Sequence, residues 1–440
     1  MSLLDPNITP FSLEAYYTPT LPESGDRLTA IVAVEAAQSD LMVSSSQERV
    51  LLFIIDKSGS MQGASIDAVR QAVMRGIDLC DEGMTIGVVV FDESASVLVK
   101  PQKADARGKA AAAQLLPVLF ASGGTAFSSG LDLARSIFQQ YPDAIRRAIF
   151  LTDGVNESER PGRFEPVLRQ CVGSFECDCW GLGSKWRVGE VQEVARALNG
   201  KASLIPGPDE IEAAFSAAIK TAASKAIADV RLRLWTPQTV QLTLIKQMNP
   251  TIQDLTTAGS RTSPQSLEIA IGSWAPSESR DYQVDLQLTS ADVGEELLAL
   301  RPSVVFRQEG QDREIRPASG RVVVTWTTDE ALSSRINPRV AHYTGQEELA
   351  LAIQGGLQAR ERGDDDAATH LLGKAVKLAS QSGNDEMTAR LQKVVDIDDA
   401  ATGTVHLKRG VTEVATMDLE LESTTTKRAA RRPAAPAQAG

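Results

Sequence analysis

Between residues 50 and 222, short continuous apolar runs alternate with longer segments in which apolar residues recur every three or four positions. Continuous runs are typical of strands buried on both faces of a parallel sheet, and the longer spacing is typical of helices packed on that sheet. The pattern predicts a doubly wound, mostly parallel six-stranded α/β domain over residues 47–224. The expected strands are 50–55, 85–91, 96–99, 147–151, 175–181 and 202–205, and the expected helices are 66–80, 105–120, 128–139, 164–171, 188–198 and 209–222. The three-residue connection 92–94 suits a hairpin, which makes one edge strand antiparallel.

A strict apolar–polar alternation replaces this pattern from about residue 227 onward, as in half-buried antiparallel strands. The alternating segments are 230–235, 240–245, 266–271, 281–288, 303–306 and 321–327, with Pro, Gly, Asn and Ser between them. They predict a β-sandwich that occupies residues 225–330. Segments 11–17 and 27–34 alternate in the same way but are too few to fold alone. We therefore expect residues 1–46 to pair with the later strands, so that the α/β domain is inserted in a discontinuous sandwich; a free N-terminal hairpin is the alternative.

Helical spacing returns between residues 344 and 396, which predicts a small C-terminal helical bundle over residues 337–399. Thr344 and Glu347 read as a capping box that begins the first helix, and Gly363 ends it. Asp364 caps a second helix, and a third is expected over 385–395. The first two helices resemble a tetratricopeptide pair, but one unit cannot form a solenoid. A three-helix bundle packed on the sandwich and a groove that binds a partner remain equal alternatives.

The last segment, residues 400–440, loses the long core pattern. Segments 404–407 and 411–421 alternate weakly and predict a hairpin or an edge strand, and the chain is expected to be disordered from about residue 422. Thr424, Thr425 and Thr426 lie in this tail between acidic and basic residues. Phosphorylation there would add a charge that an Arg-lined pocket, such as that of a forkhead-associated domain, can read. A tail that only solubilises the chain is the alternative.

Oxygen-bearing side chains follow two of the predicted strands. Asp56, Ser58 and Ser60 come directly after the first strand, Thr125 follows a Gly-Gly pair, and Asp153 caps the strand 147–151. Carboxyl ends of parallel strands are where open α/β sheets bind ligands. Carboxylate and hydroxyl oxygens gathered at one point suit a small hard cation such as Mg²⁺.

These five residues match, in order and in strand context, the metal-ion-dependent adhesion site of von Willebrand factor type A (VWA) domains. The resemblance covers about residues 47–222. It implies a divalent ion, usually Mg²⁺ with Mn²⁺ or Ca²⁺ as alternatives, held directly by the two serines and the threonine and partly through water by the two aspartates. It also implies an open coordination position that an Asp or Glu of a protein partner fills. The predicted insertion is similar to integrin β headpieces and several bacterial VWA proteins, and VWA proteins often partner AAA+ ATPases.

Composition and charge narrow the class of protein. The 440-residue chain is 42% hydrophobic and 23% charged, with a formal net charge of −12, which argues against bulk nucleic-acid binding. Residues 1–18 show no basic start followed by an apolar core, so no secretory signal is expected. The uncharged stretch 110–131 is broken by Pro117 and Gly123, so no membrane span is expected. The four cysteines lack the spacing of a disulfide framework. We therefore expect a cytoplasmic protein.

Catalytic chemistry finds no support in the sequence. No histidine precedes His342, which excludes a Ser-His-Asp triad within the α/β domain, and no P-loop occurs. A metal-dependent phosphatase would usually require more carboxylate ligands and a general base at the metal site. The function we expect is non-enzymatic, divalent-metal-dependent protein–protein interaction, with selectivity set by rim loops at 61–64, 127–128, 156–160 and 183–187. The alternatives are an adaptor in Ser/Thr-kinase signalling, acting through the threonine tail, and an accessory subunit of an AAA+ ATPase.

Overall fold

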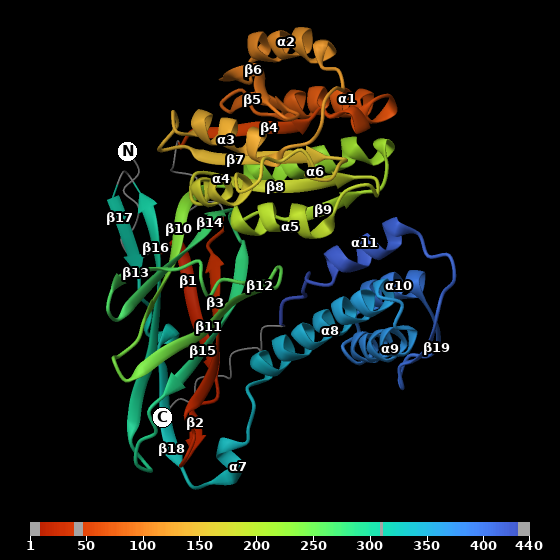
Figure 1. The fold of residues 1–440 in the computed structure, drawn as a ribbon. Helices are drawn as coiled ribbons and strands as arrows, with labels where there is room; N and C mark the ends of the chain where they lie inside the picture. The colour runs from red at the N-terminus through yellow and green to blue at the C-terminus, as the bar shows by residue number, and fades with distance from the viewer. Residues whose placement is uncertain (1–8, 39–46, 309–310, 430–440) are drawn as a thin grey trace.

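The computed structural model describes residues 9–38, 47–308 and 311–429, and its α/β domain lies at one end of the molecule (Figure 1). The expected mixed α/β fold with a mostly parallel sheet is confirmed: six strands run in the order β6-β5-β4-β7-β8-β9, and only β6 is antiparallel to its neighbour. The strands are β4 (Arg49–Asp56), β5 (Thr85–Phe91), β6 (Ala95–Lys103), β7 (Ile145–Thr152), β8 (Glu176–Leu182) and β9 (Ala202–Ile205).

Helices cover both faces of this sheet because successive residues of each strand point to opposite sides. One face packs against α1 (Ala64–Leu79), α2 (Ala106–Leu115) and α6 (Ile211–Ser224), and the other against α3 (Phe127–Phe138), α4 (Phe164–Cys171) and α5 (Val188–Ala197). Phe53 of β4 stacks on Phe215 of α6 with ring centroids 5.5 Å apart. On the opposite face, the rings of Phe150 in β7 and Phe127 in α3 lie 5.0 Å apart. Both strands that lead to the candidate metal residues are therefore fixed on both faces.

The helix predicted over residues 105–120 ends early. α2 stops at Leu115, a 3-10 turn follows (Leu116–Val118), and residues 119–126 form a loop that leads into α3. Pro117 is the physical reason, since proline lacks the amide hydrogen that continues a helix.

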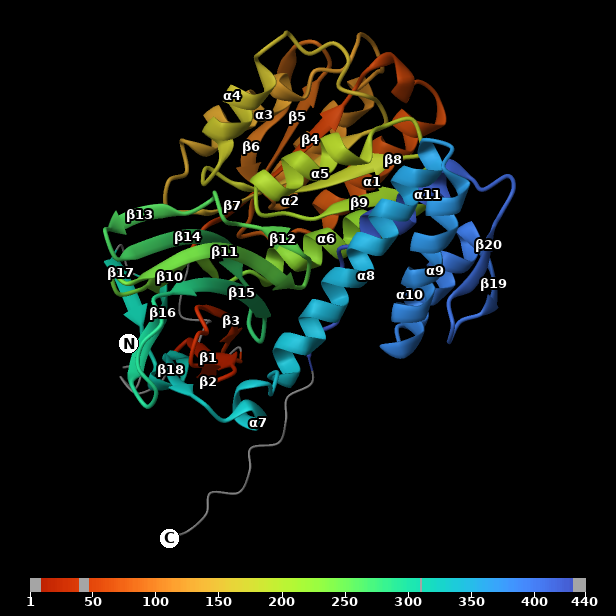
Figure 2. The ribbon, with the colours of Figure 1, turned by 60° about the horizontal axis from the view of Figure 1, so that its bottom comes forward.

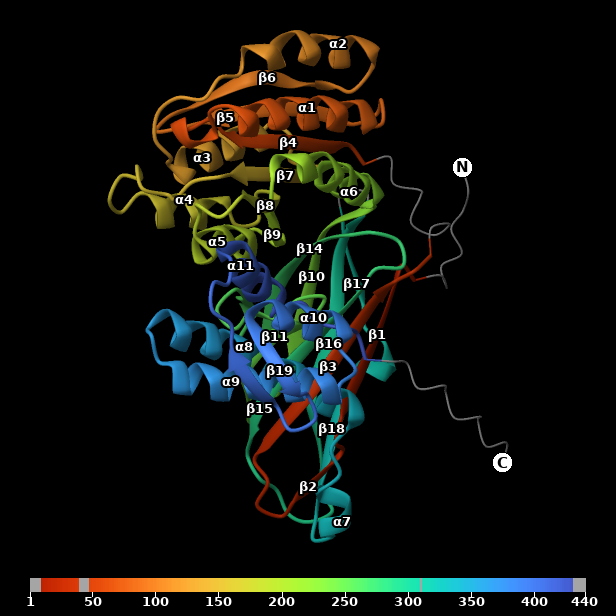
Figure 3. The same ribbon diagram turned by 90° about the vertical axis from the view of Figure 1, so that its right-hand side faces the viewer.

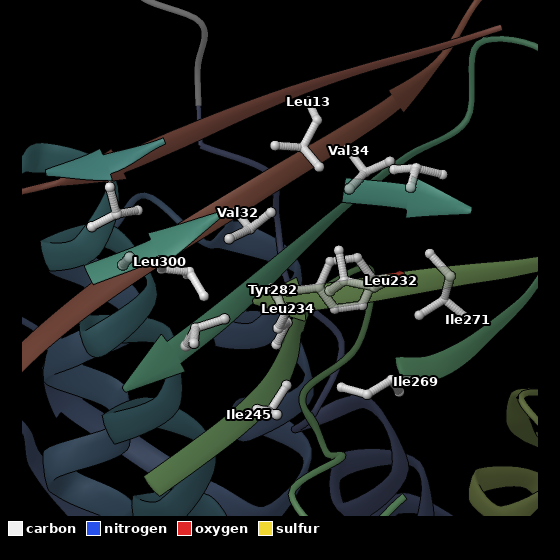
Figure 4. Close-up of a cluster of buried hydrophobic side chains, with 14 of the residues drawn as sticks. Leu13, Val32, Val34, Leu232, Leu234, Ile245, Ile269, Ile271, Tyr282 and Leu300 are labelled. Carbon is white, nitrogen blue, oxygen red and sulfur yellow. The ribbon is translucent and has the colours of Figure 1, made fainter. Parts of the chain in front are cut away.

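Below the α/β domain lies a sandwich of two antiparallel-rich sheets (Figures 1 and 3). The first contains β1 (Phe11–Tyr17), β3 (Arg27–Ala36), β15 (Ser279–Leu288), β11 (Val240–Asn249) and β12 (Gln253–Asp254). The second contains β13 (Ser260–Ser263), β14 (Ser266–Trp274), β10 (Ile227–Trp235), β16 (Glu296–Gln308), β17 (Gln311–Ile315), β18 (Val322–Thr327) and β2 (Thr20–Pro22). β3 precedes the α/β domain in sequence, yet it pairs with β15, which follows that domain. Apolar side chains such as Leu13, Val32 and Leu232 fill the space between the sheets (Figure 4).

Buried charges join the α/β domain to the sandwich at the amino ends of the central strands. Arg147 of β7 pairs with Glu176 (2.9 Å) and Asp178 (2.6 Å) of β8. Glu176 also accepts hydrogen bonds from the backbone amide and the hydroxyl of Ser273, in β14 of the sandwich. Arg147 and Asp153 are six residues apart along the chain, about 20 Å at the rise of a strand. The junction and the candidate site therefore lie at opposite edges of one sheet.

A second group of charges continues this junction. Lys225, which follows α6, pairs with Glu278 (2.6 Å) and donates to the carbonyl of Ser273 (3.2 Å). Arg280 binds the same carboxylate (2.6 Å) and lies over the ring of Trp274 at 4.5 Å. Burial raises the pKa of the Glu278 carboxyl, but the positive charges of Arg280 and Lys225 outweigh it and hold that pKa at about 2. The connection out of the α/β domain is thus fixed by ion pairs shielded from water.

The C-terminal part begins with α7 (Glu330–Ser333) and the long α8 (Pro338–Glu361), followed by α9 (Asp365–Gln381) and α10 (Asp385–Val394) (Figure 2). The expected start of the first helix is wrong. Asn337 caps α8 by accepting from the amide of Arg339 (2.9 Å), whereas Thr344 lies inside the helix and donates its hydroxyl to the carbonyl of Val340 (3.0 Å). Asp364 caps α9 as predicted.

Residues 395–422 also differ from expectation. β19 (Val395–Asp399) pairs with β20 (Thr404–Leu407), while the segment expected to alternate as a strand forms α11 (Glu413–Glu422). α11 lies between two bodies: Met417 and Leu421 enter the core of the α/β domain, and Leu419 enters the core of the helical bundle. Figure 3 shows α11 beside α5 and β9. This helix ties the bundle to the α/β domain.

The segment expected to be disordered is ordered through residue 429. Ile252 donates its amide to the carbonyl of Thr424 (2.8 Å), Thr425 forms an antiparallel bridge with Thr251, and the Thr426 hydroxyl donates to the carbonyl of Pro250 (3.3 Å). The three threonines are half-buried. Their phosphorylation stays a prediction, and residues 430–440 of the tail lie outside the described residues.

Candidate metal centre

Four of the five candidate residues come from the carboxyl edge of two neighbouring strands, and the fifth comes from a loop that packs against that edge. Asp56 is the last residue of β4; Ser58 directly precedes a 3-10 turn (Gly59–Met61), and Ser60 lies within it. β7 runs parallel to β4 with Ile55 opposite Leu151, so Asp153, directly after β7, arrives at the same edge. Thr125 comes from the loop before α3. The parallel register is what brings residues almost a hundred positions apart to one place.

Hydrogen bonds fix the two carboxylates. Asp56 is fully buried; its Oδ2 accepts from the hydroxyl of Thr152 (2.6 Å) and its Oδ1 from the amide of Ser58 (2.8 Å). Ser60 donates its hydroxyl to Oδ1 of Asp153 (2.5 Å), and the hydroxyls of Ser58 and Ser60 are 3.0 Å apart. The sequence pattern did not identify Thr152, because a threonine that ends an apolar strand carries no local sign of a partner on another strand.

Gly154 shows that these oxygens converge on one small volume. A Cβ atom placed on Gly154 would lie 3.0 Å from Oγ1 of Thr125, 3.4 Å from Oγ of Ser60 and 3.9 Å from Oδ2 of Asp56. One carbon-sized volume is thus lined by oxygens from two separate chain segments, the end of β4 with the loop after it and the loop before α3, and glycine is the residue that leaves it free of side chain. The donor set, hydroxyl and carboxylate oxygens alone, suits Mg²⁺ better than a soft metal. The residues present therefore fit the cation that the sequence implies.

The loop that carries Thr125 is held by backbone contacts. Gly59 donates its amide to the carbonyl of Gly123 (2.9 Å), and Gly123 has φ +82°, in the left-handed region that favours glycine. A Cβ on Gly124 would lie only 2.0 Å from Oγ of Ser158, so glycine is required for this close approach. Ser158 in turn donates its amide to the carbonyl of Thr125 (2.9 Å). The Gly-Gly pair thus lets the threonine loop pack between the two aspartate loops.

Burial dominates the electrostatics of the two carboxylates of the site, and Lys185 is the positive charge that acts on Asp153. Burial raises the pKa of Asp56 to about 6, against hydrogen bonds from Thr152 and Ser58 that lower it, and burial likewise raises the pKa of Asp153. Lys57, between two of the candidate residues, is paired with Asp92 instead. Buried carboxylates of this kind gain most from a bound cation. In the described part of the chain, no three His, Cys, Asp or Glu side chains gather as a metal site, so hydroxyls must complete this one.

The structure thus brings together all five residues predicted from the sequence. The predicted phosphorylation sites, Thr424 to Thr426, lie elsewhere, against the β11–β12 turn of the sandwich. Sequence reasoning also missed one stretch of the rim, the loop after α2, which it assigned to a helix; Pro117 was the available signal.

Sequence comparisons identify two segments of this fold. A sequence model of the von Willebrand factor type A domain matches residues 51–156, and one of the von Willebrand factor type A C-terminal domain matches residues 377–423. An uncharacterized protein of Synechocystis is 27% identical over 245 residues, which are 53% of this chain and 56% of that protein. Calcium-activated chloride channel regulator 1 of Sus scrofa is 35% identical over 113 residues, 24% of this chain and 12% of that protein. The match therefore spans 56% of the length of the Synechocystis protein and 12% of the length of the Sus scrofa protein. Among the described residues, no helix is both long enough and apolar enough to cross a lipid bilayer.

Solved structures extend the match to the whole chain. A von Willebrand factor type A protein from Catenulispora acidiphila superimposes with a TM-score of 0.88 at 34% identity, covering 97% of this chain and 99% of that one. The ArnB paralog VWA2 from Sulfolobus acidocaldarius shares the fold, with a TM-score of 0.59 at 13% identity over 94% of this chain and 98% of that one. At this identity and coverage, the chain belongs to the von Willebrand factor type A family.

Proposed function

We propose that this chain is a non-enzymatic protein-binding protein whose contact with its partner depends on a divalent cation at the carboxyl edge of β4 and β7. The family often mediates protein–protein interaction, which supports the general class. The observation that carries the specific proposal is the single volume beside Gly154, enclosed by oxygens of Thr125, Ser60 and Asp56. Mg²⁺ is the cation proposed, with Mn²⁺ and Ca²⁺ as alternatives.

The residues divide the work of holding the cation. Ser58, Ser60 and Thr125 would supply neutral hydroxyl oxygens, while Asp56 and Asp153 supply negative charge and orient the hydroxyls through the bonds described above. When bound there, the cation supplies positive charge and a coordination position for a carboxylate from outside. Because three of the five protein groups are neutral, an Asp or Glu of the partner gains strong charge attraction at this edge.

The rest of the chain positions this edge. The buried pairs of Arg147 and Lys225 hold the opposite edge of the sheet on the sandwich, and α11 holds the outer strand β9 to the helical bundle. The metal edge therefore points away from the sandwich, which leaves it accessible to a protein partner. No contact described above specifically favours signalling through the tail threonines or a role as an accessory subunit of an AAA+ ATPase.

Isothermal titration of Mg²⁺ into the full chain tests the proposal. Wild-type protein should take up one ion, and Thr125→Val should weaken that uptake at least tenfold, since it removes one oxygen ligand and leaves no described hydrogen-bond partner unpaired. Thr221→Val, the same change on α6 where the hydroxyl only donates to the carbonyl of Ala217 (3.0 Å), is the control and should bind as wild type does. Absence of uptake by wild-type protein, or equal uptake by Thr125→Val, would overturn the proposal.

A further inference from the structure

The loop between α2 and α3 exposes large apolar side chains beside the metal edge. Leu115 is 40% exposed, Val118 58% and Phe120 65%. These three fall within six residues, although the described part of the chain exposes only ten large hydrophobic side chains to a comparable degree. Single exposed apolar residues need no explanation, but a cluster at the rim of a binding site is typical of an interaction surface.

The packing of this loop explains why these side chains cannot turn inward. Leu116 and Leu119 fill the core, at 0% and 2% exposure, so the residues between and after them must face solvent. Arg70 of α1 donates its Nε to the carbonyl of Leu119 (2.7 Å), and Ser122 donates its amide to the carbonyl of Lys57 (2.6 Å). The burial of Leu116 holds the first part of the exposed stretch and these two hydrogen bonds hold its C-terminal end, so the apolar surface is presented by a fixed backbone. Such preorganisation lowers the entropy cost of binding.

The same loop is continuous with the metal residues. Phe120 lies three residues before Gly123, whose carbonyl accepts from Gly59, between Ser58 and Ser60. Three residues span at most about 11 Å. A partner that places a carboxylate at the cation can therefore reach Phe120 with a side chain two to four residues away, at about 3.3 Å per extended residue.

The charge distribution around the rim selects the chemistry of that side chain. No charged residue occurs between positions 110 and 131, so the loop that carries Val118 and Phe120 has no charge of its own; the charged groups against it are Arg70 at the carbonyl of Leu119 and Glu93 beside Gly124. The opposite side carries Lys185 and Arg187, both exposed. A ligand complementary to both sides has one carboxylate for the cation and an aromatic or aliphatic residue on the side of Val118 and Phe120.

We propose that Val118 and Phe120 form a second contact of the metal site, which selects partners with an apolar residue two to four positions from the coordinating Asp or Glu. This inference rests on the proposed function, because the carboxylate is what aligns the ligand. The contact would bury the Phe120 ring and part of Val118, so the loss of both should weaken a ligand of this kind about tenfold.

Phage-displayed random decapeptides with a fixed central Asp, selected on the full chain in Mg²⁺ and in EDTA, test the inference. Wild-type protein should retain peptides only in Mg²⁺, with aromatic or aliphatic residues enriched two to four positions to one side of the Asp. The double variant Val118→Ser/Phe120→Ser should take up Mg²⁺ as wild type does and lose the apolar enrichment. Val118→Ser alone should weaken it, and Ile336→Ser, which changes another exposed apolar residue far along the chain, should leave it intact.

The outcomes separate the two proposals. Mg²⁺-dependent retention without an apolar preference, or an unchanged preference in the double variant, overturns the inference and leaves the proposed function standing. No Mg²⁺-dependent retention by wild-type protein overturns both. An apolar preference that disappears only in the variants changed at positions 118 and 120 supports the second contact.

Discussion

Arg147 offers a direct test of how the α/β domain is mounted on the sandwich. Its side chain is only 7% exposed and pairs with Glu176 at 2.9 Å and Asp178 at 2.6 Å. Arg147→Met keeps most of the apolar volume but leaves Glu176, itself 13% exposed, as a buried carboxylate whose remaining described partner is Ser273. Removing one partner of a buried ion pair typically costs about 3–5 kcal/mol, so we expect Arg147→Met to lower the free energy of unfolding by about that amount.

A double-mutant cycle separates the ion pair from simple loss of packing. Glu176→Gln removes one of the two charges that Arg147→Met leaves unpaired, the other being Asp178, while its amide oxygen still accepts from Ser273. The double variant should therefore recover roughly 1–3 kcal/mol relative to the sum of the single changes. Arg169→Met is the matched control: Arg169 is 69% exposed and its pairing with Glu165 spans 3.5 Å, so this change should cost less than about 0.5 kcal/mol.

Equilibrium urea unfolding, followed by tryptophan fluorescence and far-UV circular dichroism, measures these free energies. Because the chain has several cores, the two probes are compared before a single free energy is assigned. Arg147→Met as stable as Arg169→Met, or the absence of coupling with Glu176→Gln, would refute the view that buried ion pairs hold the junction.

Three further predictions concern the site, the junction and the C-terminal segment. Mg²⁺ at a concentration a hundredfold above its Kd should stabilise the wild-type fold by about 2.7 kcal/mol and so raise its melting temperature. Gly154→Ala should abolish this rise, because the added methyl group would occupy the enclosed volume. The Glu278 carboxyl has a pKa of about 2 in the folded protein against an ordinary 4.5. It should therefore contribute about 3 kcal/mol to the free energy of unfolding, fully present above about pH 5 and lost as the pH falls toward 2. In urea unfolding across this pH range, the free energy of unfolding should decline less in Glu278→Gln than in wild type. Truncation after Glu422 removes the carbonyl that binds the amide of Ile252, so hydrogen exchange at that amide should quicken at least tenfold.

Each of these has its own check. Gly189→Ala, at a helical glycine with open space around it, should keep the Mg²⁺-induced shift that Gly154→Ala loses. An acid profile of Glu278→Gln identical to that of wild type would contradict the pKa argument. Unchanged exchange at Ile252 in the truncated chain would mean that the segment 423–429 does not hold the β11–β12 turn.

The grouping of three of the five candidate residues could be predicted because its signals are local. A continuous apolar run predicts a buried strand, and Asp56, Ser58 and Ser60 follow that run within five positions, so strand and ligands are specified together. Thr152 could not be identified in this way. Its hydroxyl is committed to Asp56, a residue on the neighbouring strand, and only the register of the sheet reveals that contact.

The C-terminal region shows where local patterns mislead. α11 packs against two bodies, with Met417 and Leu421 on the α/β domain and Leu419 on the bundle, so its apolar positions occupy more than one face and the helical period is hidden. At α8, the Asn337-Pro338 pair is a stronger start signal than the capping box at Thr344, because asparagine caps the first turn and proline fits its first position.

The tail has a polar composition typical of disorder, but composition does not report a distant partner. Asp281 is fully buried, bound by Arg339 through two hydrogen bonds and by the hydroxyl of Tyr343 (2.6 Å), and Arg428 of the tail approaches it to 3.5 Å. The buried carboxylate of Asp281 in the sandwich thus stabilises the tail through Arg428, which lies far from it in the sequence. The local sequence of the tail does not reveal this contact.

Crystals of the full chain grown with Mn²⁺, with diffraction recorded at the manganese absorption edge, test the central claim most directly. We expect one anomalous peak at the carboxyl edge of β4 and β7, within bonding distance of the hydroxyls of Ser58, Ser60 and Thr125. A map at saturating Mn²⁺ with no peak among these residues, or with a peak bound elsewhere on the chain, would contradict the account.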